Sequence, residues 1–186
     1  MRDDSDIKIF RSNREESDAG DLFSVAEELK FHIANGNSAK AKQLGKELAF
    51  LTPESADLSD ELSALLNAEW IKPDIRIQLR VLMVFCAEYT LLSELCPILA
   101  TTASEAFYAA LKEDAYGFYK SISNGAAMSF YYMAVKQRNT IKEIGDSFAM
   151  LCDAKTSERI NSLGSQVFLL TCKHIVNLIE NYGFEK

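Results

Sequence analysis

Glu88 is the residue whose surroundings in the sequence most suggest chemistry. In a helix, residues three, four and seven positions apart share a face, and the neighbours of Glu88 at this spacing are all apolar: Val81, Val84, Phe85, Leu91, Leu92 and Leu95. A carboxylate in such a patch is costly unless it is paired or protonated. A tyrosine hydroxyl, an arginine or a backbone group from another helix could satisfy it. Alternatively, Glu88 faces a cavity, where it orients a ligand or acts as an acid or base.

The two histidines give little support for metal chemistry. His174 lies midway between Leu170 and Leu178 on the inward stripe of the last predicted helix, either as a core histidine donating to a carbonyl or as a pH-sensitive or catalytic imidazole. His32 follows Glu28 by four residues, which predicts an ordinary surface pair. No glutamate has a histidine three residues on, as di-iron bundles require, so we expect no metal and no cofactor.

The cysteines and the short motifs do not indicate an enzyme. Four cysteines are widely spaced in apolar helical stretches, as is typical of buried reduced thiols: Cys86, Cys96, Cys152 and Cys172. No cationic cluster flanks them to stabilise a thiolate. The sequence contains no Cys-x-x-Cys, Gly-x-Gly-x-x-Gly, P-loop or Gly-x-Ser-x-Gly motif. We therefore name no catalytic residue.

Aromatic side chains are concentrated on two consecutive predicted helices, and they exceed what one core stripe requires: Phe107, Tyr108, Tyr116, Phe118, Tyr119, Phe130, Tyr131 and Tyr132. They could form a hairpin core with tyrosine hydroxyls at the rim, a pocket for a small apolar or planar ligand, or a face that pairs with another subunit. For the pocket, we expect the lining residues to be Glu88, Tyr108, Tyr119, Tyr131 and His174. For the interface, we expect Tyr132 and Phe168.

The elements that would position these residues are helices. Residues 1–17 are polar and acid-rich and are expected to form a flexible acidic tail. From residue 18, apolar periodicity predicts a helical hairpin that is interrupted at Asn35-Gly36 and ends before Pro53. Ser38 is the expected cap of its second helix.

A short third helix follows, with Asp57 or Ser59 as its cap, and Pro73 marks its end. The segment 74–95 is apolar around most of its circumference, which predicts a central helix that Pro97 kinks or ends. Three further helices are expected: one opened by Ser104 and Glu105 and running to the turn at 123–125, one from Gly125 to Leu151, and one from Ser157 to Tyr182.

No run of alternating β-branched residues and no internal repeat is present. The sequence therefore predicts an all-α, single-domain bundle of six to seven helices over 18–186. Within it we distinguish a hairpin part over 18–70 and a more apolar part over 74–186. We count them as one domain, because the joint at Lys72-Pro73 is too short for a free linker.

Charge and hydropathy exclude several classes of partner. The net charge is −7, and residues 1–70 carry all of this excess, so we expect no nucleic-acid binding. The longest apolar run has seven residues, over 81–87, whereas a membrane span needs about 20. The amino terminus lacks the apolar core of a secretory signal. We expect a cytoplasmic protein.

The sequence favours a self-association or protein-interaction module that forms a homodimer or binds a protein partner through its apolar and aromatic faces. The alternative is a sensor-type domain that holds a small apolar ligand in an aromatic-lined pocket near Glu88. A third hypothesis makes that pocket catalytic through Glu88.

Overall fold

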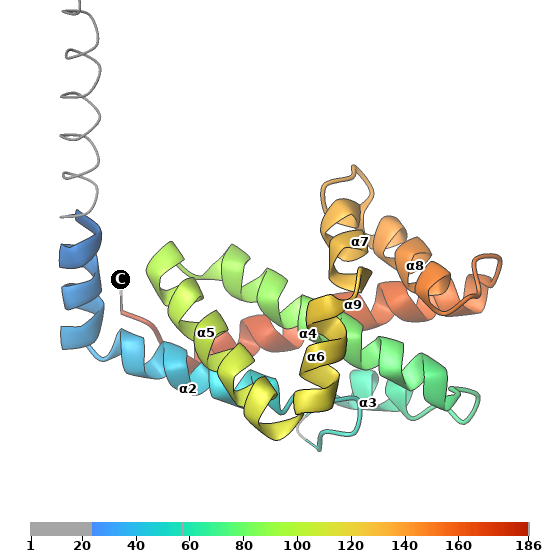
Figure 1. Cartoon of the computed structure of the whole chain (residues 1–186), viewed down its shortest axis with the longest axis horizontal. Coiled ribbons are helices and arrows are strands. Elements are labelled where there is room, and N and C mark those ends of the chain that lie inside the picture. The colour runs from blue at the N-terminus through green and yellow to red at the C-terminus, as the bar shows by residue number, and fades with distance from the viewer. Residues whose placement is uncertain (1–23, 57, 186) are drawn as a thin grey trace, which may run out of the picture.

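The computed structural model describes residues 24–56 and 58–185, and within them every regular element is a helix (Figure 1). Residues 24–34 are helical, and the elements that follow are α2 (Asn37–Ala49), α3 (Asp60–Leu66), α4 (Pro73–Glu94), α5 (Pro97–Asp114), α6 (Tyr116–Asn124), α7 (Ala127–Ala134), α8 (Thr140–Leu151) and α9 (Glu158–Tyr182). This confirms the all-α bundle. The expected tail over 1–17 and the Asp57 cap lie outside the described residues.

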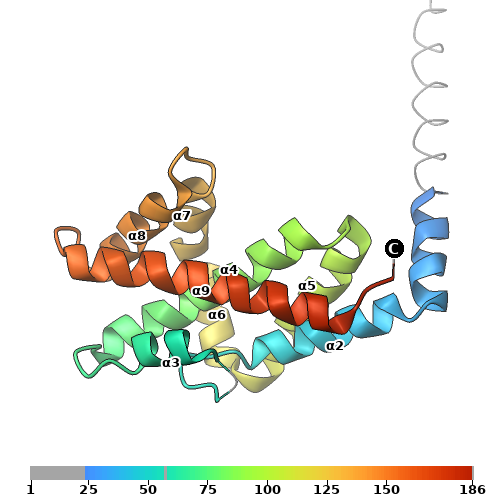
Figure 2. The ribbon, with the colours of Figure 1, turned by 180° about the vertical axis from the view of Figure 1, so that it is seen from behind.

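The long helices α4 and α9 pack against each other through the middle of the molecule (Figure 2). The helix α2 packs chiefly against α5, and α8 packs against α9. Buried apolar side chains from α2 to α9 form one continuous core. Among the described residues, no helix combines the length and the apolar character needed to cross a membrane.

The central helix expected over 74–95 is confirmed as α4. Its apolar run over 81–87 is buried without interruption, because other helices cover α4 on several sides. Arg80 lies next to this run and is only partly buried. Its guanidinium lies 4.2 Å from the centre of the Phe118 ring on α6. Glu88 follows the buried run directly and is only partly buried.

The expected start of the fifth helix at Ser104 is wrong, because α5 begins at Pro97. Leu95 and Cys96 are extended, which ends α4 and turns the chain sharply. Proline is well suited to the first helical position, where its fixed φ fits and its missing N–H has no intrahelical acceptor. Pro97 therefore both separates the two helices and begins the second one.

Two segments expected as continuous helices are each broken in the structure. Ala115 leaves the helical region, with φ −135° and ψ 55°, so the chain bends between α5 and α6. The bend lets α6 fold back over α4, where Phe118 meets Arg80 and Ile122 is buried. A second break separates α7 from α8, and there the side chain of Asn139 caps α8 by accepting from the Lys142 N–H.

The capping predictions had mixed outcomes. Ser59 caps α3 as predicted, accepting from the Leu62 N–H at 3.3 Å. Ser157, predicted only as the start of the last helix, caps α9 by accepting from the Ile160 N–H at 3.3 Å. Ser38, however, lies inside α2 and does not cap it. The residue before α2 is Gly36, with φ 81°, a left-handed conformation that glycine adopts without strain. That conformation allows the chain to turn between the two helices within two residues.

The helices α2 and α5 approach each other closely at Gly45. A Cβ atom there would collide with the backbone carbonyl of Ala103 on α5, and it would lie 3.0 Å from the Phe107 nitrogen. Only a residue without a side chain permits this contact between the two backbones.

We predict that Gly45→Ala lowers the free energy of unfolding by about 1–3 kcal/mol, because the backbone of α5 must shift to admit the methyl group. Urea denaturation followed by circular dichroism would measure the loss. Gly117→Ala is the matched control. It is exposed, with no atom within 4 Å of the added Cβ, and should stabilise α6 by up to about 1 kcal/mol. Equal effects at the two sites would contradict the close packing of α2 on α5.

Candidate functional site

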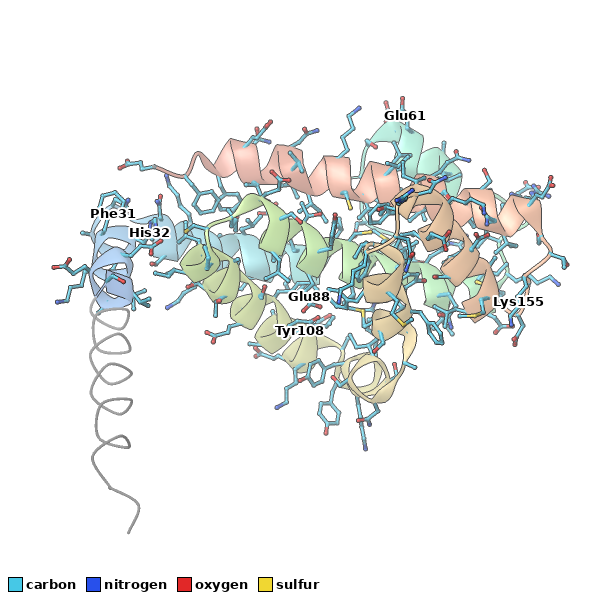
Figure 3. The ribbon with its side chains drawn as sticks, turned by 90° about the horizontal axis from the view of Figure 1, so that it is seen from above. Phe31, His32, Glu61, Glu88, Tyr108 and Lys155 are labelled. Atoms are coloured by element: carbon cyan, nitrogen blue, oxygen red, sulfur yellow. The ribbon has the colours of Figure 1, made fainter. Side chains whose placement is uncertain are left out.

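A cavity of about 460 Å³ opens where α4, α5, α6 and α7 meet, and Glu88 lies on its wall. Figure 3 shows Glu88 and Tyr108 lying next to each other between their helices. The lining residues are Glu88 from α4, Tyr108 from α5, Tyr119, Ile122 and Ser123 from α6, Gly125 from the turn, and Met128, Ser129 and Tyr132 from α7. The cavity depends on the two bends of the chain, at Ala115 and Gly125, that bring α6 and α7 back over α4.

Two tyrosines lie on the cavity wall beside the Glu88 carboxylate. The Tyr108 hydroxyl donates to Glu88 Oε2 at 2.5 Å, and Tyr132 lines the same space from α7. Burial raises the pKa of Tyr108 and of Tyr132 well above the ordinary value, and the neighbouring carboxylate raises both further. Both phenols therefore remain protonated at neutral pH, and Glu88 accepts a hydrogen bond from Tyr108.

Ring contacts hold the tyrosines in place. Tyr132 packs edge-on against the buried Phe85, with ring centres 5.2 Å apart and planes at 84°. Tyr108 meets Phe107 at 4.9 Å and Tyr119 at 6.4 Å, both in T-shaped arrangements. Such edge-to-face pairs are favourable for aromatic rings, so the wall of the cavity is fixed before any ligand arrives.

The expected lining residues only partly converge. Glu88, Tyr108 and Tyr119 line the cavity, as the pocket hypothesis requires. Tyr131 does not, since it is fully buried against Phe85, and its hydroxyl has no hydrogen-bond partner among the described residues. His174 lines a different hollow of about 170 Å³ between α2 and α9, beside Glu47 and Phe50.

The two expected interface residues occupy other positions in the single chain. Tyr132 lines the cavity together with Glu88. Phe168 is 5% exposed and packs against Phe85 and Tyr89, with ring centres 6.4 and 5.9 Å away. Among exposed apolar side chains are instead Val25, Leu29, Phe31, Ile33 and Met133.

His32 is buried, which corrects its expected place on the surface. Its Nε2 lies 3.8 Å from Glu28 Oε1, as the spacing predicted, but also 3.5 Å from Cys96 Sγ. Glu28, His32 and Cys96 thus bring together three atoms of the kind that ligate zinc, all within 4.8 Å of one another. The sequence did not indicate this cluster, because Cys96 is 64 residues away from His32.

The hydrogen bonds around His32 oppose metal binding. The Asn37 amide is oriented by the backbone of Glu185, since its Oδ1 accepts from the Glu185 N–H at 3.0 Å and its Nδ2 donates to the Glu185 carbonyl at 2.7 Å. Nδ2 therefore also donates to His32 Nδ1, at 3.1 Å. A neutral His32 then carries its proton on Nε2, which faces Cys96 and Glu28 as a donor and has no lone pair for a metal.

The four cysteines are free thiols, and only Cys86 is buried completely. The neighbouring Cys86 thiol lowers the pKa of Cys172 on α9, although burial opposes this. Burial raises the pKa of Cys152 to about 11, and the charge of Asp153 adds to the effect. A reactive thiolate is thus not favoured at Cys152.

Comparison with known proteins adds no name to these sites: no family model, curated protein or solved structure matches the chain. The chemistry of the cavity therefore follows from its lining residues alone. The sequence did not indicate six of the nine lining residues: Ile122, Ser123, Gly125, Met128, Ser129 and Tyr132, the last of which was expected at an interface. It predicted no bend at Ala115, so it did not show that α6 and α7 would fold back to the space beside Glu88. The polar run before Thr140, with Asn139 as a cap, was the signal for the break after α7.

We predict that Tyr108→Phe destabilises the protein by about 1–2 kcal/mol at pH 7, because Glu88 loses a donor in a partly solvated site. Folding raises the pKa of Tyr108 above its unfolded value near 10. Its contribution is therefore complete below pH 10 and is lost as the pH rises further. The difference between wild type and variant should shrink above pH 10, as measured by urea denaturation at a series of pH values.

Tyr131→Phe is the matched control, because it removes a buried hydroxyl that has no partner. It should leave stability at pH 7 unchanged or raise it by up to about 1 kcal/mol. A loss at Tyr131 as large as that at Tyr108 would show that the Glu88 hydrogen bond is not the cause.

Proposed function

We propose that the protein is a small-molecule-binding helical domain and that its ligand occupies the cavity beside Glu88. The observation that carries this proposal is a carboxylate directed into an aromatic-walled cavity and held there by the Tyr108 hydroxyl at 2.5 Å. Ligand sites are typically concave, with aromatic side chains on the wall and convergent polar groups that orient the bound molecule.

A structural role alone does not account for the surroundings of the Glu88 carboxylate. A buried carboxylate with a structural role alone is best enclosed, so that every acceptor position meets a protein donor. Glu88 instead stays partly exposed beside a space of about 460 Å³ that Ser123 and Ser129 also line. The Ser123 hydroxyl already donates to the Tyr119 carbonyl at 2.9 Å, so Glu88 and Ser129 supply the hydrogen-bonding capacity for a bound molecule.

Methionine methyl groups give a direct test. Met128 lines the cavity, whereas Met83 is buried elsewhere in α4 and Met133 is exposed on α7. We predict that a library of small aromatic and amine fragments, screened by NMR on protein with ¹³C-labelled methionine methyls, contains compounds that shift the Met128 signal selectively. Ser129→Trp fills the cavity and should remove those shifts, and Gln137→Trp is the exposed control outside it. A screen in which no compound moves Met128 would overturn the proposal.

Self-association is the second candidate, and one exposed surface favours it. The helix over 24–34 projects from the body of the molecule (Figure 1). Val25, Leu29 and Ile33 recur on it every four residues and are 50%, 40% and 61% exposed, so they form an apolar stripe along one face. A short helix with such a stripe gains most of its stability from packing against a partner.

We predict that sedimentation across a concentration series detects a dimer near twice 20.8 kDa and that Leu29→Glu returns it to the monomer. The control is Ala34→Glu, which adds the same charge on another face of the helix. A wild-type monomer at all concentrations would rule out self-association through this stripe and would leave the cavity proposal unaffected.

A further inference from the structure

We infer that the ligand of the Glu88 cavity is a small organic cation, an ammonium ion with an apolar or aromatic body. This inference rests on the proposed function and specifies its ligand class. It is carried by the charge, the hydrogen-bonding capacity and the rings of the same lining residues.

The charge of the lining selects for a cation. Glu88 is the only ionisable acid or base, apart from the tyrosines, among the residues that line the cavity, and none of those residues is a lysine, arginine or histidine. Because burial and Glu88 raise the pKa values of Tyr108 and Tyr132, their phenols add no negative charge at neutral pH. A bound anion would meet the carboxylate without any compensating cation, whereas an ammonium ion would neutralise it.

The carboxylate has acceptor capacity to spare. An ionised carboxylate offers about four lone-pair positions, and the Tyr108 hydroxyl occupies one of them. Both oxygens of Glu88 are acceptors only, so a ligand that binds them must supply N–H or O–H donors. An ammonium group supplies up to three donors together with the complementary charge, which makes its hydrogen bonds the stronger kind.

The aromatic wall suits the rest of such a ligand. Tyr108, Tyr119 and Tyr132 present rings to the cavity, and a cation near the face of a tyrosine ring is attracted by its quadrupole. Ile122 and Met128 supply apolar surface beside them. The cavity volume of about 460 Å³ accommodates an amine that carries a single ring.

Three probes of similar shape and different charge test this inference: phenethylammonium, 2-phenylethanol and 3-phenylpropanoate. Each is titrated into the full chain at pH 7 while the Met128 methyl signal is followed. We expect phenethylammonium to bind at least about tenfold more tightly than the neutral alcohol, and the carboxylate to bind more weakly still. High salt should weaken only the cation, because the ion pair is partly solvated.

Two variants assign the preference to the Glu88 charge. Glu88→Gln keeps a carbonyl acceptor for the Tyr108 hydroxyl, so the fold should persist. In this variant the cation and the alcohol should bind with about equal affinity. Glu94→Gln is the matched control, since it removes an exposed carboxylate from the same helix outside the cavity. Tyr119→Leu tests the ring and should weaken the cation more than the alcohol.

The outcomes separate this inference from the proposed function. Equal or tighter binding of the alcohol or the carboxylate at Met128 would overturn the cation and leave the cavity as a ligand site. Shifts of Met128 by other fragments, but not by phenethylammonium, would do the same. A Met128 signal that no probe and no fragment moves would overturn both. A cation preference that survives Glu88→Gln would overturn the role of this carboxylate.

Discussion

The helix α4 is apolar on most of its circumference, and the rest of the structure depends on covering it. Its segment over 81–87 is buried residue after residue, which no single neighbouring helix could achieve. The long helix α9 lies along one side, while α5, α7 and α8 each contact α4 over shorter stretches. Burial of this apolar surface is the main favourable term in folding, so the positions of the other helices follow from it.

Because short helices cover part of α4, a cavity remains beside it. The helices α6 and α7 are brief, and they reach α4 only because the chain bends at Ala115 and Gly125. Where they and α5 meet over α4, their side chains leave a space rather than a closed seam. Glu88 lies at that space, at the point where the buried run of α4 ends. The same geometry therefore leaves the carboxylate partly exposed and spares it complete burial among apolar side chains.

The structure contains a second polar cluster, and it contrasts with the first. Asn37 is fully buried and bonds both to His32 and, twice, to the backbone of Glu185. These hydrogen bonds join three segments: the helix over 24–34, the start of α2 and the backbone at Glu185. It commits the polar groups of Asn37 to partners within the protein. The Glu88 carboxylate retains acceptor positions, which is why we assign ligand binding to it and not to His32.

Local features of the sequence determined much of the fold. Apolar periodicity placed α4 and α9 within one or two residues, the hydroxyls of Ser59 and Ser157 marked two helix starts, and the apolar surroundings of Glu88 showed that it needed a partner. These features act within one helical turn. The tertiary structure decided the bend at Ala115, the choice of Tyr108 as that partner, the burial of His32 and the separation of His174 from Glu88. Periodicity shows which face of a helix avoids water, but contacts between residues distant in sequence decide what covers that face.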